Sequence, residues 1–593
     1  MVIHFGRRPQ SISEIALASP RLNKTIRYEP DERCSPLVAL GVGAQGITLV
    51  IAPTVLIVAI TVLATGQGES YLTWSVFAAL IIVGIVITLQ AAKIGRLGGG
   101  HILITGVTPN FIAVSVLALD EGGPSMLASL IVLSSLFYLA VVTWLPLLRR
   151  IITPVVSGSV LMLIAALILP ICFDRLSEVP EGTSTVAGPI VAAVTLIVST
   201  LLVLRGPGIW RPLSLLIGIV AGCVAAVPFG LYDLASLAEK SWVGIPELEF
   251  PGLDVTPTVG FWALLPMFLI VTLVQAIKSI GDGVVVQQVA RRKPRATDFR
   301  LIQGSMYATG IGILLSGVAG TPPTTSYSSL SVSLIHLTGV AARSVGYAMG
   351  AILLVLAMFP KVTGVLLIIP SPVMGGFLLV AVAMLFLEGI QTLSRAGLNP
   401  QKAIVAGLAF SIGLGMENHN VLEDLLGSPW GTLLGNGITI GAATAIALTA
   451  FLELTGPRGK RLETSLDTSN LPQIDAFLQE LAGKMGWDST STDRLRSAGE
   501  ETLSSLLQPG NEQPEGKVPR LVVTARPEGR SVELEFVTAF EDENLEDRLA
   551  YLDDQTETED EREISFRLLR HYASSVRHQK YQGMDIVTVR VDG

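Results

Sequence analysis

The sequence has little charge and few cysteines, and each shortage narrows what the chain can be. Only 15% of its 593 residues are charged, whereas soluble globular proteins average about a quarter. Its three cysteines, Cys34, Cys172 and Cys223, are scattered, so they form neither a metal-ligand motif nor an even disulfide framework. No P-loop, catalytic triad or kinase motif occurs, and we therefore expect no enzyme, no cofactor and no bound metal.

What the sequence has instead is a succession of apolar runs. Half of the residues are hydrophobic, the mean hydropathy is +0.58, and runs of about 20 apolar residues follow one another. Runs of this length predict transmembrane helices, so we expect an all-α polytopic membrane protein. We predict fourteen spans, near residues 37–65, 71–92, 100–118, 125–148, 152–173, 187–204, 212–231, 258–283, 302–319, 324–340, 344–359, 362–390, 402–416 and 431–455.

Basic residues mark alternate loops between these spans. With the N-terminus placed inside, the outer loops contain only Arg175, Lys240 and Lys361. Because Lys and Arg accumulate on the cytoplasmic side, this distribution supports the count and places both termini in the cytoplasm. We expect a multi-pass protein of the plasma (inner) membrane, in contact with the lipid bilayer. The inner run Arg291–Arg295 is most simply a topology signal that faces anionic lipid.

Composition divides the chain into four parts. Residues 1–36 are polar and Arg-rich, without the apolar core of a signal peptide, and are predicted to be a cytoplasmic segment. Residues 37–455 are predicted to form the membrane domain of fourteen spans, 456–470 a linker, and 471–593 a small cytoplasmic α+β domain. Residues 456–593 contain 27 acidic and 17 basic residues, against 22 and 24 in the rest, and this acidic balance argues against nucleic-acid binding.

The C-terminal domain is predicted from its own hydrophobic patterns. Helices are expected over 472–485, 493–507 and 565–575, and strands over 520–525, 531–537 and 585–591. This order loosely resembles the ATPase-like domain of anti-sigma-factor serine kinases. In that family a magnesium-binding asparagine follows a glutamate by four residues; here Glu501 is followed by Ser505, so we expect the fold without ATP chemistry. An unrelated α+β domain that serves dimerisation or stability is the alternative.

Two pairs of segments repeat at one offset. Ile-Thr-Pro-Val-Val-Ser-Gly at 152–158 matches Pro-Ser-Pro-Val-Met-Gly-Gly at 370–376, 218 positions later. The same offset carries 108–110 of the third span onto 326–328 of the tenth, and both spans are interrupted by Pro, Thr, Ser or Gly. The offset divides the fourteen spans into two halves of seven. Because seven is odd, the second half is inverted relative to the first. Inverted repeats with paired broken spans are typical of secondary transporters. The alternative is that Pro and Gly are simply common in transmembrane helices.

The two broken spans are the predicted binding site. Irregular backbone at membrane depth persists only where it is buried in protein or lines a cavity. If 106–110 and 323–328 are extended, helices begin near Phe111 and Ser329 and direct free N–H groups to the midplane, which suits a carbonyl-rich or anionic ligand. The polar side chains expected around that ligand are Gln45, Thr108, Asn110, Thr324, Thr325, Tyr327, Ser328 and Ser329.

Two ionisable residues lie within the eighth span. Lys278 and Asp282 are one helical turn apart, so their side chains can meet, and an unpaired charge at mid-bilayer costs about 3 kcal/mol on insertion scales. They form either a self-satisfied structural pair or, as we favour, part of a substrate cavity. Glu388 and Glu417 lie near span ends and are expected to be interfacial charges.

Three motifs are similar to those of a known family. They are SIGDG at 279–283, GIGILLSGVAGTPPTTSY at 310–327 and IIPSPVMGGFLL at 368–379. Together they resemble the nucleobase–ascorbate transporter family, the xanthine/uracil permeases, over roughly residues 37–455. The resemblance implies two inverted seven-span repeats with core and gate domains, elevator-like alternating access, and a homodimer that often uses protons. It also implies uracil, xanthine or urate as the substrate, bound between the eighth span and the breaks in the third and tenth.

The chain departs from that family where the substrate is expected to bind. The glutamate usual in the eighth span is Lys278, and the acid or histidine four residues later is Asp282. An ammonium in place of a carboxylate favours an acceptor-rich or anionic ligand. We therefore expect Lys278 to contact a ligand oxygen, Asp282 to tune Lys278, and the substrate to be a urate-like purine or another small organic anion. The other departures are Ser328 and Ser329 for Glu or Gln and then Asn, Thr309 for Asp, and Ala44, beside Gln45, for His.

Two other functions fit the same sequence. The first is a transceptor, which binds a ligand and signals through the C-terminal domain without useful flux. The second is an inorganic-anion transporter related to the sulfate permeases. Ligand-induced thermal shift without uptake would favour the first, and competition of uptake by sulfate or bicarbonate would favour the second.

Overall fold

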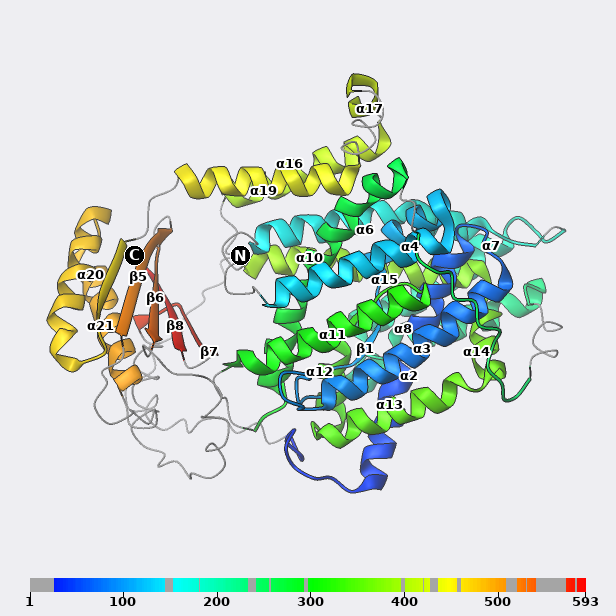
Figure 1. The fold of residues 1–593 in the computed structure, drawn as a ribbon, viewed down its shortest axis with the longest axis horizontal. Coiled ribbons are helices and arrows are strands. Elements are labelled where there is room, and N and C mark those ends of the chain that lie inside the picture. Colours follow the sequence, from blue (N-terminus) through cyan, green and yellow to red (C-terminus); the bar gives the residue numbers. More distant parts are fainter. Residues whose placement is uncertain are drawn as a thin grey trace, which may run out of the picture. The chain divides into compact units, whose positions relative to one another are not determined.

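The apolar runs of the sequence form helices in a computed structural model, shown in Figure 1. The structure describes residues 26–143, 153–180, 182–232, 241–254, 258–292, 297–395, 400–419, 421–426, 436–455, 460–507, 520–528, 531–539, 572–581 and 584–593. The chain divides into two units, Met1–Arg295 with Leu301–Thr449, and Ala296–Arg300 with Ala450–Gly593. The main helices of the first unit are α2 (Pro36–Leu63), α3 (Glu69–Ala91), α4 (Ile112–Thr143), α6 (Pro154–Ser177), α7 (Ala187–Arg205), α8 (Ser214–Ala226), α10 (Val259–Val289), α11 (Phe299–Ala319), α12 (Ser328–Thr338), α13 (Arg343–Ala357), α14 (Pro360–Leu367), α15 (Ser371–Arg395), α16 (Pro400–Asn418), α17 (Val421–Leu426) and α19 (Gly437–Thr455).

These helices have the length and composition of membrane spans. Among the described residues, eight helices are long and apolar enough to cross a bilayer, and α13 with α14, bent by 85°, would make a ninth. α4 covers parts of two predicted spans, which meet at a kink where Gly123 has a φ of 70° and Pro124 follows. The first unit is therefore a helical, polytopic membrane-type fold, while the count of fourteen spans stays a prediction.

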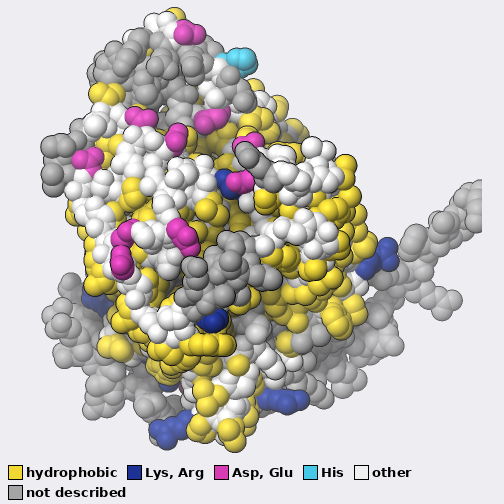
Figure 2. Space-filling view, turned by 90° about the vertical axis from the view of Figure 1, so that its right-hand side faces the viewer, with side chains coloured by type: hydrophobic (Ala, Val, Ile, Leu, Met, Phe, Trp, Pro, Cys, Tyr) yellow, Lys and Arg dark blue, Asp and Glu magenta, His cyan; other side chains and the backbone are white. Residues whose placement is uncertain are grey.

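Large apolar side chains are exposed on the outer faces of several helices. α16 exposes Ile404, Leu408 and Ile412, and α7 exposes Ile197 and Leu201, in each case four residues apart. Figure 2 shows broad hydrophobic surface beside a group of Asp and Glu side chains on one face of the molecule. Hydrophobic stripes of this extent suit the hydrocarbon of a bilayer, which agrees with a multi-pass membrane protein.

Packing sorts the helices into two groups. α2, α3, α4, α10, α12 and α13 each contact other members of one set, which we call the first helix group. α6, α7, α8, α15 and α16 do the same and form the second helix group. Small residues permit close approach within a group: a Cβ added to Gly158 of α6 would lie 2.7 Å from the carbonyl oxygen of Gly389 in α15.

Two short strands interrupt the first helix group where the sequence predicts broken spans. β1 (Thr105–Val107) and β3 (Thr324–Ser326) pair in antiparallel fashion and are fully buried. A 3-10 turn over Pro109–Phe111 then leads into α4, and α12 begins at Ser328. The pairing satisfies backbone groups that no helix satisfies at these positions. Both predicted interruptions are therefore present.

The segment before α2 binds to the ends of α10 and α12. Tyr28 forms a β-bridge with Val340, and the Arg292 guanidinium donates to the Glu32 carboxylate at 2.6 Å and 2.8 Å. This hydrogen bond lowers the pKa of Glu32. A guanidinium nitrogen of Arg291 lies 3.9 Å from a carboxylate oxygen of Glu29. Acids just before the first helix therefore pair with Arg291 and Arg292, and the interpretation of this arginine run as a topology signal facing anionic lipid stays a prediction.

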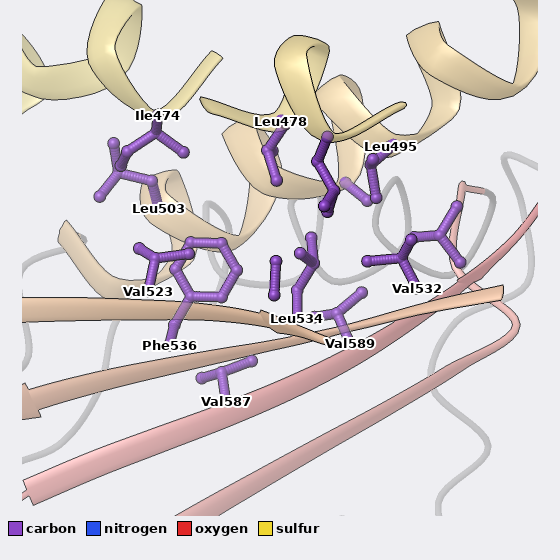
Figure 3. Close-up of a cluster of buried hydrophobic side chains, with 14 of the residues drawn as sticks. Ile474, Leu478, Leu495, Leu503, Val523, Val532, Leu534, Phe536, Val587 and Val589 are labelled. Atoms are coloured by element: carbon purple, nitrogen blue, oxygen red, sulfur yellow. The ribbon is translucent and has the colours of Figure 1, made fainter. Parts of the chain in front are cut away.

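The second unit is a sheet covered by two helices. α20 (Leu471–Met485) and α21 (Ser489–Leu507) pack their apolar faces against the strands. Figure 3 shows Leu478 and Leu495 above Leu534 and Phe536 in this core. The strand order is β2-β7-β8-β6-β5-β4, and the strands are β2 (Thr297–Asp298), β4 (Lys460–Ser465), β5 (Arg520–Glu528), β6 (Ser531–Ala539), β7 (Ser575–Tyr581) and β8 (Met584–Asp592).

Two details of this unit differ from the sequence prediction, and a third is largely untested. The predicted linker 456–470 contains β4, because its residues alternate between half-buried and exposed along a sheet edge. β2 comes from the segment between α10 and α11 and pairs in parallel with β7. The helix predicted over 565–575 lies largely outside the described residues, and β7 begins at Ser575.

Candidate functional site

The polar residues of α10 share one face of an otherwise apolar helix. α10 begins at an N-cap, where the Thr258 hydroxyl accepts from the Phe261 N–H, and continues without a break to Val289. Gln275, Lys278, Ser279 and Asp282 follow at spacings of three and four residues, which align side chains along a helix. This face lies against β3 and α12.

Asp282 connects α10 by hydrogen bonds to β3 and α12, at the second interruption. Its two carboxylate oxygens accept hydrogen bonds from the Ser326 hydroxyl at 2.7 Å and the Ser328 hydroxyl at 2.5 Å. Ser326 ends β3 and Ser328 begins α12, so the carboxylate spans the point where strand becomes helix. The residue is only 4% exposed. Its charge is therefore stabilised by hydroxyl donors rather than by water.

A second set of contacts joins the first interruption to α10 and to the other break. The Asn110 amide donates to Gln275 Oε1 at 3.1 Å, and the Gln275 backbone carbonyl accepts from the Ser279 hydroxyl at 2.9 Å. The hydroxyls of Thr325 and Thr108 are hydrogen-bonded at 2.9 Å. Side chains from both breaks and from α10 thus form one buried polar cluster.

Tyr327 is held between the two breaks with its ring towards Lys278. Its N–H donates to the Ile104 carbonyl oxygen at 2.8 Å, and its hydroxyl donates to the Val107 carbonyl oxygen at 2.7 Å. The Lys278 ammonium lies 5.9 Å from the centroid of the ring. This separation is within the range of a cation–π interaction, so the tyrosine helps to hold the charge.

The ion pair of Lys278 is with Glu388 of α15, not with Asp282. The ammonium lies 3.1 Å from Glu388 Oε2, and the two side chains are 11% and 35% exposed. The alternative of a self-satisfied Lys278–Asp282 pair is wrong, because two serine hydroxyls donate to the Asp282 carboxylate and the Glu388 carboxylate pairs with the ammonium. The favoured expectation, that both residues line a substrate cavity, stays a prediction. The expectation of a solvated interfacial role for Glu388 is corrected by the same contact.

The structure brings together most, but not all, of the predicted site residues. Lys278, Asp282, Thr108, Asn110, Thr325, Tyr327 and Ser328 take part in the contacts above. Gln45 and Ser329 are exposed on α2 and α12, and Phe111 is completely buried at the turn before α4. The sequence prediction missed Glu388, Gln275, Ser279 and Ser326.

One signal in the sequence could have found Glu388. It is an acid inside a predicted apolar span, and such a charge needs a partner. Apart from Lys402 at the first residue of the thirteenth predicted span, Lys278 is the one lysine or arginine inside the predicted spans. Pairing the two by elimination would have been possible, whereas the partners Gln275 and Ser326 carry no comparable signal.

The donors of this cluster suit a ligand with several oxygen acceptors. An ammonium, an amide and several hydroxyls can donate, and an aromatic ring lies beside them. Among the described residues, no group of three or more His, Cys, Asp or Glu could hold a metal ion. Groups of this kind can hydrogen-bond a small polar molecule.

Comparisons with known proteins identify the family of this chain. A family profile for xanthine and uracil permeases, described as a permease family, matches residues 39–423. The xanthine permease XanP of Escherichia coli is 28% identical over 431 residues, which cover 70% of this chain and 90% of that protein. The uric acid permease PucK of Bacillus subtilis is 27% identical over 440 residues, which cover 73% of this chain and 100% of that protein. Among solved structures, the transmembrane domain of the cyanobacterial bicarbonate transporter BicA aligns with 72% of this chain and all of its own at 15% identity, with a TM-score of 0.45.

Proposed function

Because the chain belongs to the xanthine/uracil permease family, we propose that it is a secondary transporter of an oxidised purine such as xanthine or urate, or of a related small organic anion. Relatives with named substrates are permeases of xanthine and of uric acid, so the chain is a transporter and not an enzyme. The observation that carries the substrate class is the Lys278 ammonium beside the Tyr327 ring, within a cluster of amide and hydroxyl groups.

The proposed binding mode follows from what each group can donate. Lys278 contacts an oxygen of the substrate, because an ammonium has three donors and no acceptor. Tyr327 offers an aromatic face to a planar ring, and Asn110 offers an amide. Asp282 holds the serines at the second break and so positions α12. The remaining predicted contacts are Thr108, Phe111, Thr325, Ser328 and Ser329, and the exposed Gln45 is the weakest member of the set.

The transport cycle that we propose uses the two helix groups as moving parts. The fourteen spans form two inverted seven-span repeats, with the first helix group as core and the second as gate. The presence of both interruptions in the first group supports this assignment. The core carries the substrate across in an elevator-like movement. The protein lies in the plasma (inner) membrane as a homodimer with cytoplasmic termini, and protons are the candidate coupling ion.

Uptake into proteoliposomes tests this function. The full-length protein should accumulate radiolabelled xanthine or urate, and unlabelled purines should compete while sulfate and bicarbonate should not. Lys278→Gln should weaken the apparent affinity by about tenfold or more, since a hydrogen bond to a charged group is worth about 1.5–3 kcal/mol. Glu178→Gln, which removes an ion pair with Arg175 at the end of α6, should transport like the wild type.

The outcomes separate the three functions. Ligand-induced thermal stabilisation without uptake would favour a sensor that signals through the C-terminal unit. Competition by sulfate or bicarbonate, with no effect of purines, would favour an inorganic-anion transporter. Unchanged affinity in Lys278→Gln would remove the ammonium from the substrate site.

A further inference from the structure

The ion pair between Lys278 and Glu388 joins the two helix groups. Lys278 is on α10 of the first group, and Glu388 is on α15 of the second, 3.1 Å away. By contrast, the pair between Arg175 and Glu178 lies within and just beyond a single helix. Any movement of one group past the other would have to break the Lys278–Glu388 contact.

The side chains of Lys278 and Glu388 differ in how easily they can move out of their ion pair. The Lys278 side chain is 11% exposed and lies near the Tyr327 ring, whereas the Glu388 side chain is 35% exposed. The backbone beside Glu388 is fixed, because a Cβ at Gly389 would lie 2.7 Å from Met162 Cγ and 2.8 Å from the Gly158 carbonyl oxygen. The glutamate side chain can therefore rotate away while α15 and the ammonium stay in place.

The carboxylate on α10, Asp282, lies one helical turn from Lys278 but does not form its ion pair. Its two oxygens accept hydrogen bonds from Ser326 and Ser328, and the ammonium pairs with Glu388 instead. A lysine ammonium without a close counter-charge is costly in a low-dielectric interior. A bound anion can supply that counter-charge when Glu388 leaves.

From these contacts we propose that Glu388 is an internal competitor for the negative charge of the substrate. In the empty carrier Glu388 neutralises Lys278 and ties the two helix groups together. An anionic substrate takes the ammonium, frees the glutamate and releases the tie. The pair thereby selects anionic over neutral ligands, because only an anion replaces the charge that is lost. This inference rests on the proposed function for the identity of the ligand.

Binding to the purified full-length protein in lipid nanodiscs tests the competition. Urate, an anion at neutral pH, should bind Glu388→Gln about tenfold more tightly than the wild type, a difference of about 1.4 kcal/mol. Neutral uracil should not gain affinity, and Glu388→Asp should behave nearly like the wild type. Asp31→Asn is the control, because it removes a carboxylate from ion pairs with Arg291 and Arg343, neither of which joins the two groups. Equal or weaker urate binding to Glu388→Gln would overturn the competition.

Transport gives a second measurement, whose result would not change if Glu388 had only a structural role. Because the ion pair holds the two helix groups together in the empty carrier, Glu388→Gln should keep urate exchange across the membrane and raise the ratio of net uptake to exchange. Net uptake and exchange that fall together would contradict the proposal.

A double-mutant cycle keeps the tie testable even if no purine binds. The thermal stabilities of Lys278→Gln, Glu388→Gln and the double variant, measured without ligand, give the coupling between the two side chains. A clear coupling between Lys278 and Glu388, together with no purine binding, would contradict the proposed function but support the ion pair between the helix groups. A coupling of zero would overturn the tie itself, whatever the protein transports.

Discussion

The two units of the chain differ in the polar side chains that they bury. Both enclose apolar side chains, such as Leu56 and Phe268 in the first unit and Phe536 and Leu534 in the second. Among the described residues, the first unit also encloses charged and amide groups, such as Asp282, Asn110 and Gln275, and exposes leucine and isoleucine on its outer helices, whereas the second keeps its ion pairs on the surface. Buried charged and amide groups therefore distinguish the first unit from the second.

The difference shows which interactions can specify each fold. In water, burying apolar side chains drives the strands and helices of the second unit together. In a bilayer, lipid tails are as apolar as leucine, so apolar contact does not distinguish a helix partner from the solvent. The first unit must use close packing at glycines and buried hydrogen bonds instead, and its polar residues mark its contacts.

Removing the largest ring from the core of the second unit should have the largest effect on stability. Phe536 is completely buried between the sheet and its helices. Phe536→Ala should destabilise the second unit by about 3–5 kcal/mol, which is the usual cost of deleting a buried phenyl ring. Hydrogen exchange of the β5, β6 and β8 amides would measure this loss. Val537→Ala, on the opposite face of the same strand, is the control, and a similar effect there would contradict the assignment of the core.

The same comparison explains how much of the fold the sequence could predict. The breaks at Thr105–Val107 and Thr324–Ser326 were predictable, because Pro, Thr and Ser interrupt an apolar run there. β6 was predictable because apolar and charged residues alternate along it, in the order Val-Glu-Leu-Glu-Phe at 532–536. β2 was not, because two residues have no period and their partner strand is almost 280 positions away.

The polar cluster was predictable in part of its membership but not in its pairing. Spacing placed Lys278 and Asp282 on one turn of a helix, and local proximity suggested that they bind each other. Their actual partners come from elsewhere in the chain, Glu388 on α15 and two serines at the second break. Periodicity shows which residues share a face, whereas partners from distant helices depend on tertiary packing.

Removing one serine donor from Asp282 should have a smaller effect on stability but a larger one on transport. Ser326→Ala leaves one oxygen of a buried carboxylate without its 2.7 Å hydrogen bond. We expect a loss of about 1.5–3 kcal/mol, because the acceptor is charged and cannot reach water. Thermal unfolding of the protein in nanodiscs, followed together with urate uptake, would measure both effects. Ser177→Ala at the exposed end of α6 is the control. If Ser326→Ala matched this control in both assays, Asp282 would not be the group that holds α10 to the break.

The smallest change is expected at a surface carboxylate of the second unit. Glu480 accepts hydrogen bonds from the ammonium groups of Lys460 and Lys484, each at 2.7 Å, and these lower its pKa from 4.5 to about 2. A carboxyl with a lowered pKa stabilises the fold above its unfolded pKa, and this stabilisation is lost as the pH falls through the folded value. Glu480→Gln should therefore slightly increase hydrogen exchange in the second unit at neutral pH, and the difference from the wild type should fade between about pH 4 and pH 2. Because the groups are exposed, about 1 M salt should also remove most of the difference. A difference that survives both acid and salt would mean that this surface pair behaves like the buried one at Lys278.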